Sequence, residues 1–261
     1  MTESKDEPLV LSDLREGVAI YTLNDPQKRN PLSKAMLEEL GGRLREAEAD
    51  PAVRAVVIAH RGPAFSAGHN IRELVGADQE AAAALFRLSS AMMGQIRNLP
   101  KPVIAQVEGL ASAAGCQLAA TCDLIVAAET AAFQTPGVMI GLFCSTPMVP
   151  LSRAIPTKKA MEMLLTGRPI DAHEAERLGL VNRVVPAERL ADETLALAAE
   201  IIAYSAETIG MGKQAFYRQL PLPIEAAYDV ARETMTANAM TGDAQEGMSA
   251  FLEKRPPVFK H

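Results

Sequence analysis

Short apolar runs rich in Val and Ile recur along the chain and are separated by longer amphipathic stretches. Runs of about four to eight such residues between turn residues predict β-strands. Five strands are expected on this pattern: Val18–Leu23, Val53–Ala59, Val103–Val107, Leu124–Ala128 and Val181–Val185.

Two of the intervening stretches carry clear helix signals. Ser33 is a suitable N-cap for a helix over Lys34–Ala49, in which apolar residues recur along one stripe. A second helix is expected over Gln79–Asn98, ended by the prolines that flank Lys101. Strands that alternate with helices in this way predict an α/β fold.

Beyond about Pro156 nearly the whole chain shows helical periodicity. Six helices are expected there: Thr157–Leu165, Ala172–Leu178, Glu188–Tyr204, Glu207–Gln219, Ile224–Met240 and Asp243–Glu253. The sequence has no fixed-period repeat and no flexible Gly/Ser linker. We therefore expect a strand-rich core followed by a helical part that packs with it as one unit.

The composition supports a large folded unit with an aliphatic core. Of the 261 residues, 48% are apolar, 22% are charged and only 4% are aromatic, with no Trp. These values exclude a disordered chain, a collagen and a coiled-coil array. The formal charge of −6 and the pI near 5.4 argue against a nucleic-acid binder, because such proteins present a basic face. No apolar run approaches the ~20 residues that a membrane helix needs, so no membrane partner is expected.

The N-terminus and the cysteines bear on the cellular compartment. Residues 1–8 are polar and contain several acidic side chains, unlike a secretory signal or a transit peptide, so we expect a cytoplasmic protein. Cys116, Cys122 and Cys144 lie in apolar surroundings. An odd number of such cysteines favours buried thiols in a reducing compartment over a disulfide framework.

Two loops gather small residues where a strand pattern gives way to a helix pattern. They span Arg61–Asn70 and Glu108–Gln117. Small residues let a ligand approach the backbone, and the first N–H groups of a helix have no acceptor within it. Two such groups from different segments make an oxyanion hole, which stabilises negative charge on a carbonyl oxygen. Small-residue turns also serve tight packing, so the loops alone leave both interpretations open.

Spaced motifs over nearly the whole chain narrow this choice. They are Asp25–Leu32, Phe65–Ile71, Lys101–Ala105, Ala114–Asp123, Thr166–Ile170, Ala175–Val181 and Glu246–Arg255. In this order they resemble the crotonase family, the enoyl-CoA hydratase and isomerase superfamily. Ala113–Gln117, Thr135–Val138 and Gly141–Pro147 look like one branch of that family in particular.

The resemblance implies a crotonase-type α/β fold in two parts. Residues 1–200 would form a spiral of ββα turns with an acyl-CoA site, and residues 201–261 a helical segment that builds oligomers. A homotrimer or a dimer of trimers is expected. Coenzyme A would arrive as part of the substrate, so no separate cofactor and no metal are expected.

The resemblance also implies roles for individual residues. The backbone N–H groups of His69 and Ala114 would form the oxyanion hole for a thioester enolate. The residues expected to bind CoA are Lys28, Arg29, Ala67, Gly68, His69, Gly115, Phe251 and Lys254, of which Phe251 and Lys254 would reach the CoA of a neighbouring subunit. Where the family commonly has Gly, this chain has Ala114. A backbone donor survives that change if the local conformation suits an L-residue.

Two departures from the family pattern concern its acid and base. A hydratase of this family carries two glutamates beside the thioester, at positions that are Gln117 and Gly137 in this chain. A carboxamide orients water but has no useful pKa, and glycine has no side chain. Fast hydration by the usual route is therefore not expected.

Three functions remain open. The first is an enoyl-CoA hydratase-like lyase that relies on its oxyanion hole, and the second is decarboxylation of a malonyl-type CoA, whose first step needs no carboxylate base. The third is a binding or regulatory protein that retains affinity for CoA thioesters without turnover. The His69 ring is the first candidate for a replacement base, although packing over the CoA channel is the more common role of such a ring.

Other candidate residues fit simpler roles. Cys144 and Ser145 lack a Gly-x-Ser-x-Gly elbow and a paired His, which argues against a hydrolase. His60 and His173 stand alone, without metal-ligand spacing. Asp123 is expected to be a helix-end partner. The chain has no dinucleotide-binding glycine motif and no P-loop, so redox and phosphoryl-transfer chemistry have no support.

Overall fold

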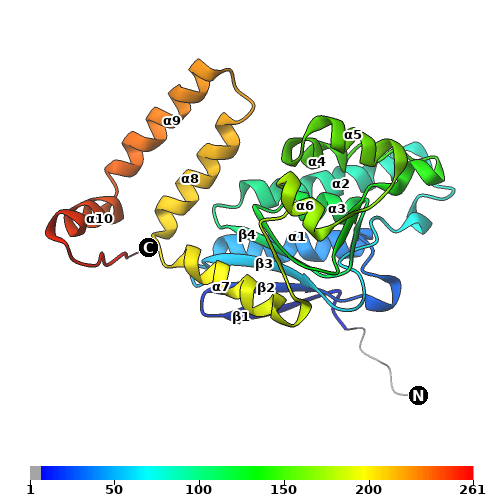
Figure 1. The fold of residues 1–261 in the computed structure, drawn as a ribbon, viewed down its shortest axis with the longest axis horizontal. Helices are drawn as coiled ribbons and strands as arrows, with labels where there is room; N and C mark the ends of the chain where they lie inside the picture. The colour runs from blue at the N-terminus through cyan, green and yellow to red at the C-terminus, as the bar shows by residue number, and fades with distance from the viewer. Residues whose placement is uncertain (1–6, 261) are drawn as a thin grey trace.

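The computed structural model describes residues 7–260 and centres on a six-stranded sheet (Figure 1). Its strand order is β1-β2-β3-β4-β6-β9. The strands are β1 (Val10–Arg15), β2 (Val18–Leu23), β3 (Ala55–His60), β4 (Val103–Val107), β6 (Leu124–Ala128) and β9 (Arg183–Val185). The first two strands form an antiparallel hairpin, and every later pairing in this sheet is parallel.

A second, three-stranded sheet has the order β5-β7-β8. It consists of β5 (Leu110–Ser112), β7 (Ala132–Gln134) and β8 (Ile170–Asp171). Because β4 continues into β5 and then into α3 (Ala114–Thr121), and β6 into β7, successive turns of chain supply one strand to each sheet. This is the ββα spiral that the resemblance implies.

Both faces of the large sheet are buried. Along β3, Val56 and Ile58 join the main core, whereas Val57 and Ala59 join a second apolar cluster. The helix pair α1 (Lys34–Ala49) and α2 (Gln79–Asn98) packs over one face, and α7 (Leu190–Ile202) covers the other with Leu190 and Leu197. Two-sided burial explains why these strands read as continuous apolar runs instead of alternating patterns.

The remaining helices of this part surround the second sheet. They are α4 (Met148–Ala154), α5 (Thr157–Thr166) and α6 (Ala172–Leu178), with 3-10 turns at Pro26–Lys28, Ile71–Glu73, Pro136–Ile140 and Ala187–Arg189. Capping follows the sequence signals: Ser33 Oγ accepts the Met36 N–H at 3.2 Å, and glycines at 167 and 179 end α5 and α6 with positive φ.

Several expected boundaries were wrong for local reasons. Val53 belongs to the turn after α1, where its N–H donates to Asp50, so β3 starts at Ala55. The last strand is shorter than expected and starts at Arg183, because the Val181 N–H still donates to Ala175 at the end of α6. The expected helix over 188–204 consists of a 3-10 turn followed by α7. Strands β1, β5, β7 and β8 and helix α4 were not expected.

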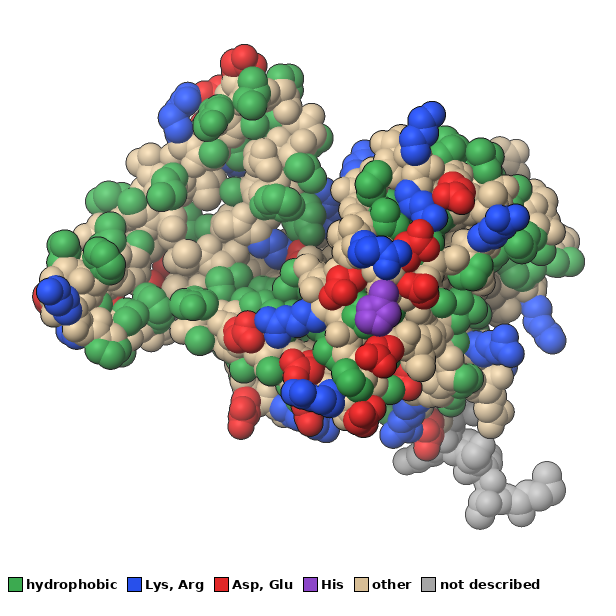
Figure 2. All heavy atoms as spheres, viewed as in Figure 1, with side chains coloured by type: hydrophobic (Ala, Val, Ile, Leu, Met, Phe, Trp, Pro, Cys, Tyr) green, Lys and Arg blue, Asp and Glu red, His purple; other side chains and the backbone are tan. Residues whose placement is uncertain are grey.

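The last three helices project away from the sheet as a separate arm (Figure 1). They are α8 (Ala206–Gln219), α9 (Ile224–Ala239) and α10 (Gly242–Glu253). Large apolar side chains on this arm face solvent in the single chain, including Met235, which is 72% exposed, and Phe251, which is 82% exposed. The green surface scattered over the arm in Figure 2 shows the same feature.

A buried ion pair fixes the root of the arm. Lys213 Nζ on α8 lies 2.6 Å from Asp123 Oδ2 and donates to the carbonyls of Ile96 and Lys101 at 2.9 Å each. The Tyr217 hydroxyl donates to Asp123 Oδ1 at 2.8 Å. Asp123 is therefore a structural partner, and the direction in which α8 leaves the core is set by these bonds.

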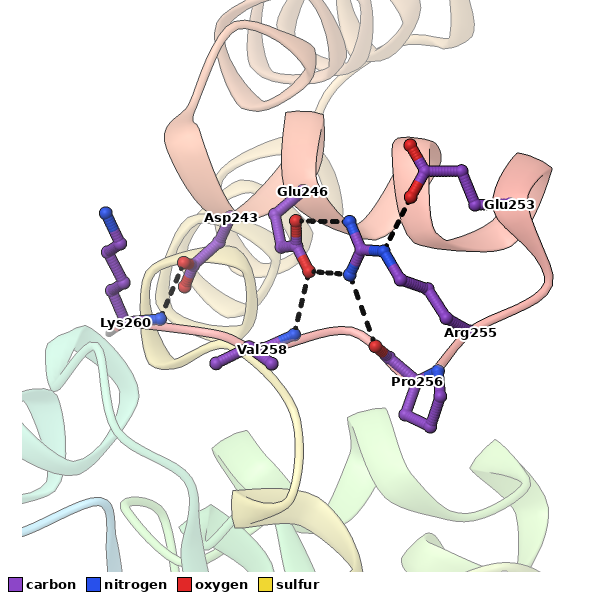
Figure 3. A network of polar contacts seen from close by, with 7 residues as sticks. All are labelled: Asp243, Glu246, Glu253, Arg255, Pro256, Val258 and Lys260. Carbon is purple, nitrogen blue, oxygen red and sulfur yellow. Dashed lines mark hydrogen bonds and ion pairs between the residues drawn. The ribbon is translucent and has the colours of Figure 1, made fainter.

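The tail that follows α10 folds back onto that helix (Figure 3). The Arg255 guanidinium pairs with Glu246 and Glu253, and Glu246 also accepts the Val258 N–H at 3.0 Å. The Lys260 N–H donates to Asp243 at 2.9 Å. Within residues 7–260 no helix is both long enough and apolar enough to cross a bilayer.

Candidate functional site

The two small-residue loops lie against each other. The Ser66 N–H donates to Leu110 at 3.2 Å, and the Ser112 N–H donates to Ser66 at 2.9 Å. These bonds pair the loop after β3 with β5, so the loop is carried to the start of α3. The sequence placed both loops after strands but gave no sign of their direct pairing.

Close contact between the loops depends on two glycines. Gly68 has φ +96°, and a Cβ there would lie 2.9 Å from Ala113 Cβ and 3.3 Å from Ala114 N. A Cβ at Gly115 would lie 2.4 Å from Ser66 O. Only residues without a side chain allow this approach. The Gly68–His69 peptide therefore lies beside the first residue of α3.

Ala114 begins α3 in helical conformation, so an alanine is accommodated there. Its N–H is one of the first in the helix and has no acceptor within it. The strained residue is Ala113, with φ 49° and ψ −115°, a conformation that costs on the order of 1–3 kcal/mol outside glycine. Bonds from its N–H to Gln134 and from Gln117 to its carbonyl, both 3.0 Å, hold it in place. This conformation of Ala113 sets the direction in which α3 begins. The sequence analysis did not predict it.

A cavity of about 430 Å³ lies beside these backbone groups. Ala67 and His69 line it from one loop, and Ala113 and Ala114 from the other. The rest of the wall is largely apolar and includes Ile71, Phe86, Met139, Ile140, Leu142 and Phe143. Its volume is in the range of small-molecule sites, which are about 300–1,000 Å³.

Gly137 lines this cavity but has no room for a side chain. A Cβ there would lie 1.9 Å from the carbonyl oxygen of Leu142 and 2.9 Å from Cys144 Sγ. The Gly137 N–H donates to that sulfur at 3.3 Å. The segment from Leu142 to Cys144 therefore occupies the space that a glutamate at 137 would need.

Gln117 borders a different cavity. It is 4% exposed and lines a smaller space of about 200 Å³ together with Arg97, Thr121 and Arg153. Among the described residues its Oε1 has no hydrogen-bond partner. Thr146 borders both cavities. Of the two positions at which the family carries glutamates, only Gly137 thus lines the cavity beside Ala114.

The His69 ring has a defined tautomer. Its Nδ1 lies 3.1 Å from the carbonyl oxygen of Leu32, so Nδ1 carries the proton and Nε2 carries the lone pair. Nε2 is buried and has no partner among residues 7–260, and the ring packs edge-on against Phe86. Burial lowers the pKa of His69, which keeps the imidazole neutral at pH 7.

A groove of about 680 Å³ continues from the cavity past Ala67, His69 and Ile71. Its charged lining residues are Lys28 and Arg72 together with Asp25 and Glu73, and Lys28 pairs with Asp25 at 3.2 Å. Lys28 is an expected CoA residue, whereas Arg72 was missed because nothing in its sequence context marks it. The side chain of Arg29 is exposed and does not line the groove, but its carbonyl accepts the Ala67 N–H at 2.9 Å.

Asn30 connects the segments around Asp25 and Ala64 by hydrogen bonds, and the sequence analysis did not predict this role. Its side chain is fully buried, and Nδ2 donates to the carbonyls of Arg61 and Ala64 at 2.9 and 2.8 Å. Its Oδ1 accepts the Asp25 N–H at 2.8 Å. With φ 51° it adopts the left-handed conformation that Asn tolerates, a signal that the Asn-Pro pair already carried.

Two expected CoA residues lie far from both spaces within one chain. Phe251 and Lys254 are on and just after α10, and neither lines the cavity or the groove. Lys254 ends the helix with φ 55°. Among the described residues no group of three or more His, Cys, Asp or Glu side chains is arranged to hold a metal ion.

Comparison with known proteins places this arrangement in a family. The sequence profile of the Enoyl-CoA hydratase/isomerase family matches residues 13–261. The chain belongs to this family. It is 45% identical to the mouse protein named Enoyl-CoA hydratase domain-containing protein 3, mitochondrial, over 99% of this chain and 87% of the relative. It is 42% identical to a Putative enoyl-CoA hydratase of Thermus thermophilus over 93% of this chain and 97% of the relative.

Solved structures of the family have the same fold. An enoyl-CoA hydratase of Mycobacterium smegmatis superposes with a TM-score of 0.94 at 49% identity, covering 97% of this chain and 99% of that one. The human enoyl-CoA hydratase domain-containing protein 3 gives 0.93 at 44% identity, covering 96% and 99%. The crotonase fold and the likeness to the domain-containing protein 3 branch are both confirmed.

One expectation is overturned by these relatives. The mouse, rat and human proteins, each about 45% identical to this chain, are named as mitochondrial. The expectation of a cytoplasmic protein, which rested on the polar N-terminus, was therefore wrong.

Proposed function

We propose that this protein binds an acyl-CoA thioester and stabilises its enolate with the backbone N–H groups of His69 and Ala114. The observation that supports this is the close contact at Gly68, where the absence of a side chain lets peptides from two segments meet beside an apolar cavity. Fixed donors in a dry site stabilise developing charge without reorganisation, and one such donor contributes about 10²–10³ in rate.

The groove supplies a path for the CoA part of the ligand. Lys28 and Arg72 offer cations to its phosphates, which matters in a chain whose net charge is negative. The exposed apolar side chains on α8–α10 suit contacts with further copies of this chain in a homotrimer or a dimer of trimers. In such an assembly Phe251 and Lys254 would reach the CoA of a neighbouring subunit.

The reaction class is a hydratase-like transformation of the thioester without the two family glutamates. Gln117 borders another cavity and Gly137 is sterically closed, so neither position supplies an acid or a base. Decarboxylation of a malonyl-type CoA is the second candidate. It is favoured by the same steric closure, because its first step forms the enolate without a carboxylate base.

The geometry is tested by adding a methyl group between the loops. Gly68→Ala introduces a Cβ within 3.3 Å of Ala114 N and displaces one N–H relative to the other. We expect binding of acetoacetyl-CoA, followed by calorimetry and by its enolate absorbance, to weaken by about tenfold or more, because one charge-assisted hydrogen bond is lost.

Gly76→Ala is the matched control. Gly76 also has positive φ (+75°), but a Cβ there meets nothing within 4 Å. Both substitutions place a side chain at a positive φ, and only Gly68→Ala disturbs the loop contact. Equal losses in the two variants, or a natural protein with no affinity for any acyl-CoA, would contradict the proposal.

A further inference from the structure

Cys144 lies, with the Leu142 carbonyl, beside the position at which a side chain of residue 137 would begin. Its sulfur lies 2.9 Å from the position of a Cβ at Gly137 and accepts the Gly137 N–H at 3.3 Å. Cys144 is 6% exposed and lines the 430 Å³ cavity together with Ala114 and His69. The Leu142 carbonyl and the Cys144 thiol therefore lie where a glutamate side chain at position 137 would begin, and of the two only the thiol can donate a proton.

Two titratable side chains in the cavity wall have pKa values that burial shifts in opposite directions. Among the described residues that line the cavity, only His69 and Cys144 have side chains of the titratable types His, Cys, Asp, Glu, Lys, Arg and Tyr. Burial lowers the pKa of His69 and raises the pKa of Cys144. At pH 7 the wall thus carries a neutral imidazole and a protonated thiol. In one cavity the neutral imidazole can accept a proton and the thiol can donate one.

We propose that Cys144 is the proton donor to the α-carbon of the bound thioester. The inference rests on the proposed function, because it requires the enolate that His69 and Ala114 stabilise. In the step, the electron pair of the enolate C=C forms the new Cα–H bond as the S–H bond breaks, and the thioester C=O is restored. The thiolate accepts the Gly137 N–H and regains a proton from water.

The reverse step gives a direct measurement. In this direction the minor fraction of Cys144 that is a thiolate removes an α-hydrogen as a proton, the thiol exchanges with solvent, and deuterium returns to the α-carbon. Because burial raises the pKa of Cys144, the rate of exchange should rise with pH. Butyryl-CoA incubated with the protein in D₂O therefore gains deuterium at C2, which mass spectrometry detects. Cys144→Ser keeps an acceptor for the Gly137 N–H but is a much weaker acid, and we expect exchange to fall by about 10²–10⁴.

Controls separate proton transfer from folding and binding. Cys122→Ser replaces a buried thiol whose bond to the Leu118 carbonyl a hydroxyl can also make, and it should leave exchange unchanged. Acetoacetyl-CoA affinity should be unchanged in both serine variants. If Cys144→Ser does not fold, Cys144→Ala provides the same loss of the proton without a polar replacement.

The outcomes separate this inference from the proposed function. Undiminished exchange in Cys144→Ser, or binding by the natural protein with no exchange at all, would overturn the role of Cys144 and leave the acyl-CoA site standing. A natural protein that binds no acyl-CoA would overturn both. Loss of exchange in Cys144→Ser with intact affinity would support both.

Discussion

Helices α3 and α9 show how differently the two parts of the molecule are completed. In α3, every residue except Ala120 is buried by other residues of the same chain. In α9 no residue is buried, and Met235 and Tyr228 are 72% and 62% exposed. The candidate site is thus built within a single chain, whereas the arm has apolar faces that a single chain leaves uncovered. The backbone groups at His69 and Ala114 therefore need no second chain to hold them in place.

The junction between the parts should be the most sensitive point. Lys213→Met leaves Asp123 as a buried carboxylate without its cation, and loss of one member of such a pair costs about 3–5 kcal/mol of unfolding free energy. We expect a large fall in thermal stability, measured at one protein concentration. Arg232→Met, which breaks an exposed pair with Asp229, is the control and should change stability by about 0–1 kcal/mol. Similar losses in the two variants would mean that the junction is not the anchor.

Within the core, glycines should differ by what surrounds them. Gly137→Ala places a methyl group 1.9 Å from the Leu142 carbonyl and should cost about 1–3 kcal/mol through overpacking. Gly94→Ala lies within α2 with nothing inside 4 Å and should gain about 0.5–1 kcal/mol. Denaturant unfolding of both variants checks this contrast. An unchanged free energy of unfolding in Gly137→Ala would show that the Leu142–Cys144 segment can move aside at little energetic cost.

The smallest effect is expected at the tail of the arm. Hydrogen bonds from Arg255 and the Val258 N–H lower the pKa of Glu246 from 4.5 to about 2. A carboxyl with a lowered folded-state pKa stabilises above its ordinary pKa, and this contribution is lost as pH falls towards 2. In Glu246→Gln the melting temperature should therefore fall less steeply as the pH is lowered below about 4.5. Glu225→Gln, at an exposed position on α9, is the control and should leave this pH dependence unchanged. Identical profiles would count against the tail contact.

Much of the fold follows from local signals. The buried strands β2, β4 and β6 appear as predicted because their apolar runs are continuous, and Ser33 caps α1 as its sequence predicts. Strand β1 was missed because its pattern is mostly exposed, with only Val10 buried. The strands β5, β7 and β8 have two or three residues each and gain their identity from pairing with distant partners.

The site was predictable at the level of loops but not of cavities. Small residues after β3 and β4 indicated a possible ligand site, and the family resemblance assigned the backbone groups of His69 and Ala114 to it. Which side chains share a cavity depends on contacts across the chain, such as the closure of Gly137 by Leu142. The separate surroundings of Gln117, the strain at Ala113 and the bonds of Asn30 have the same origin.

The closure at Gly137 also has a pharmacological consequence. A cationic warhead designed to pair with glutamates beside a thioester would find no counter-ion among the described residues that line the 430 Å³ cavity. A thiol-directed electrophile would also gain little, because Cys144 is buried and its raised pKa keeps it in the unreactive thiol form. Selective chemical probes for this chain should therefore be sought among neutral, apolar compounds that fill this cavity.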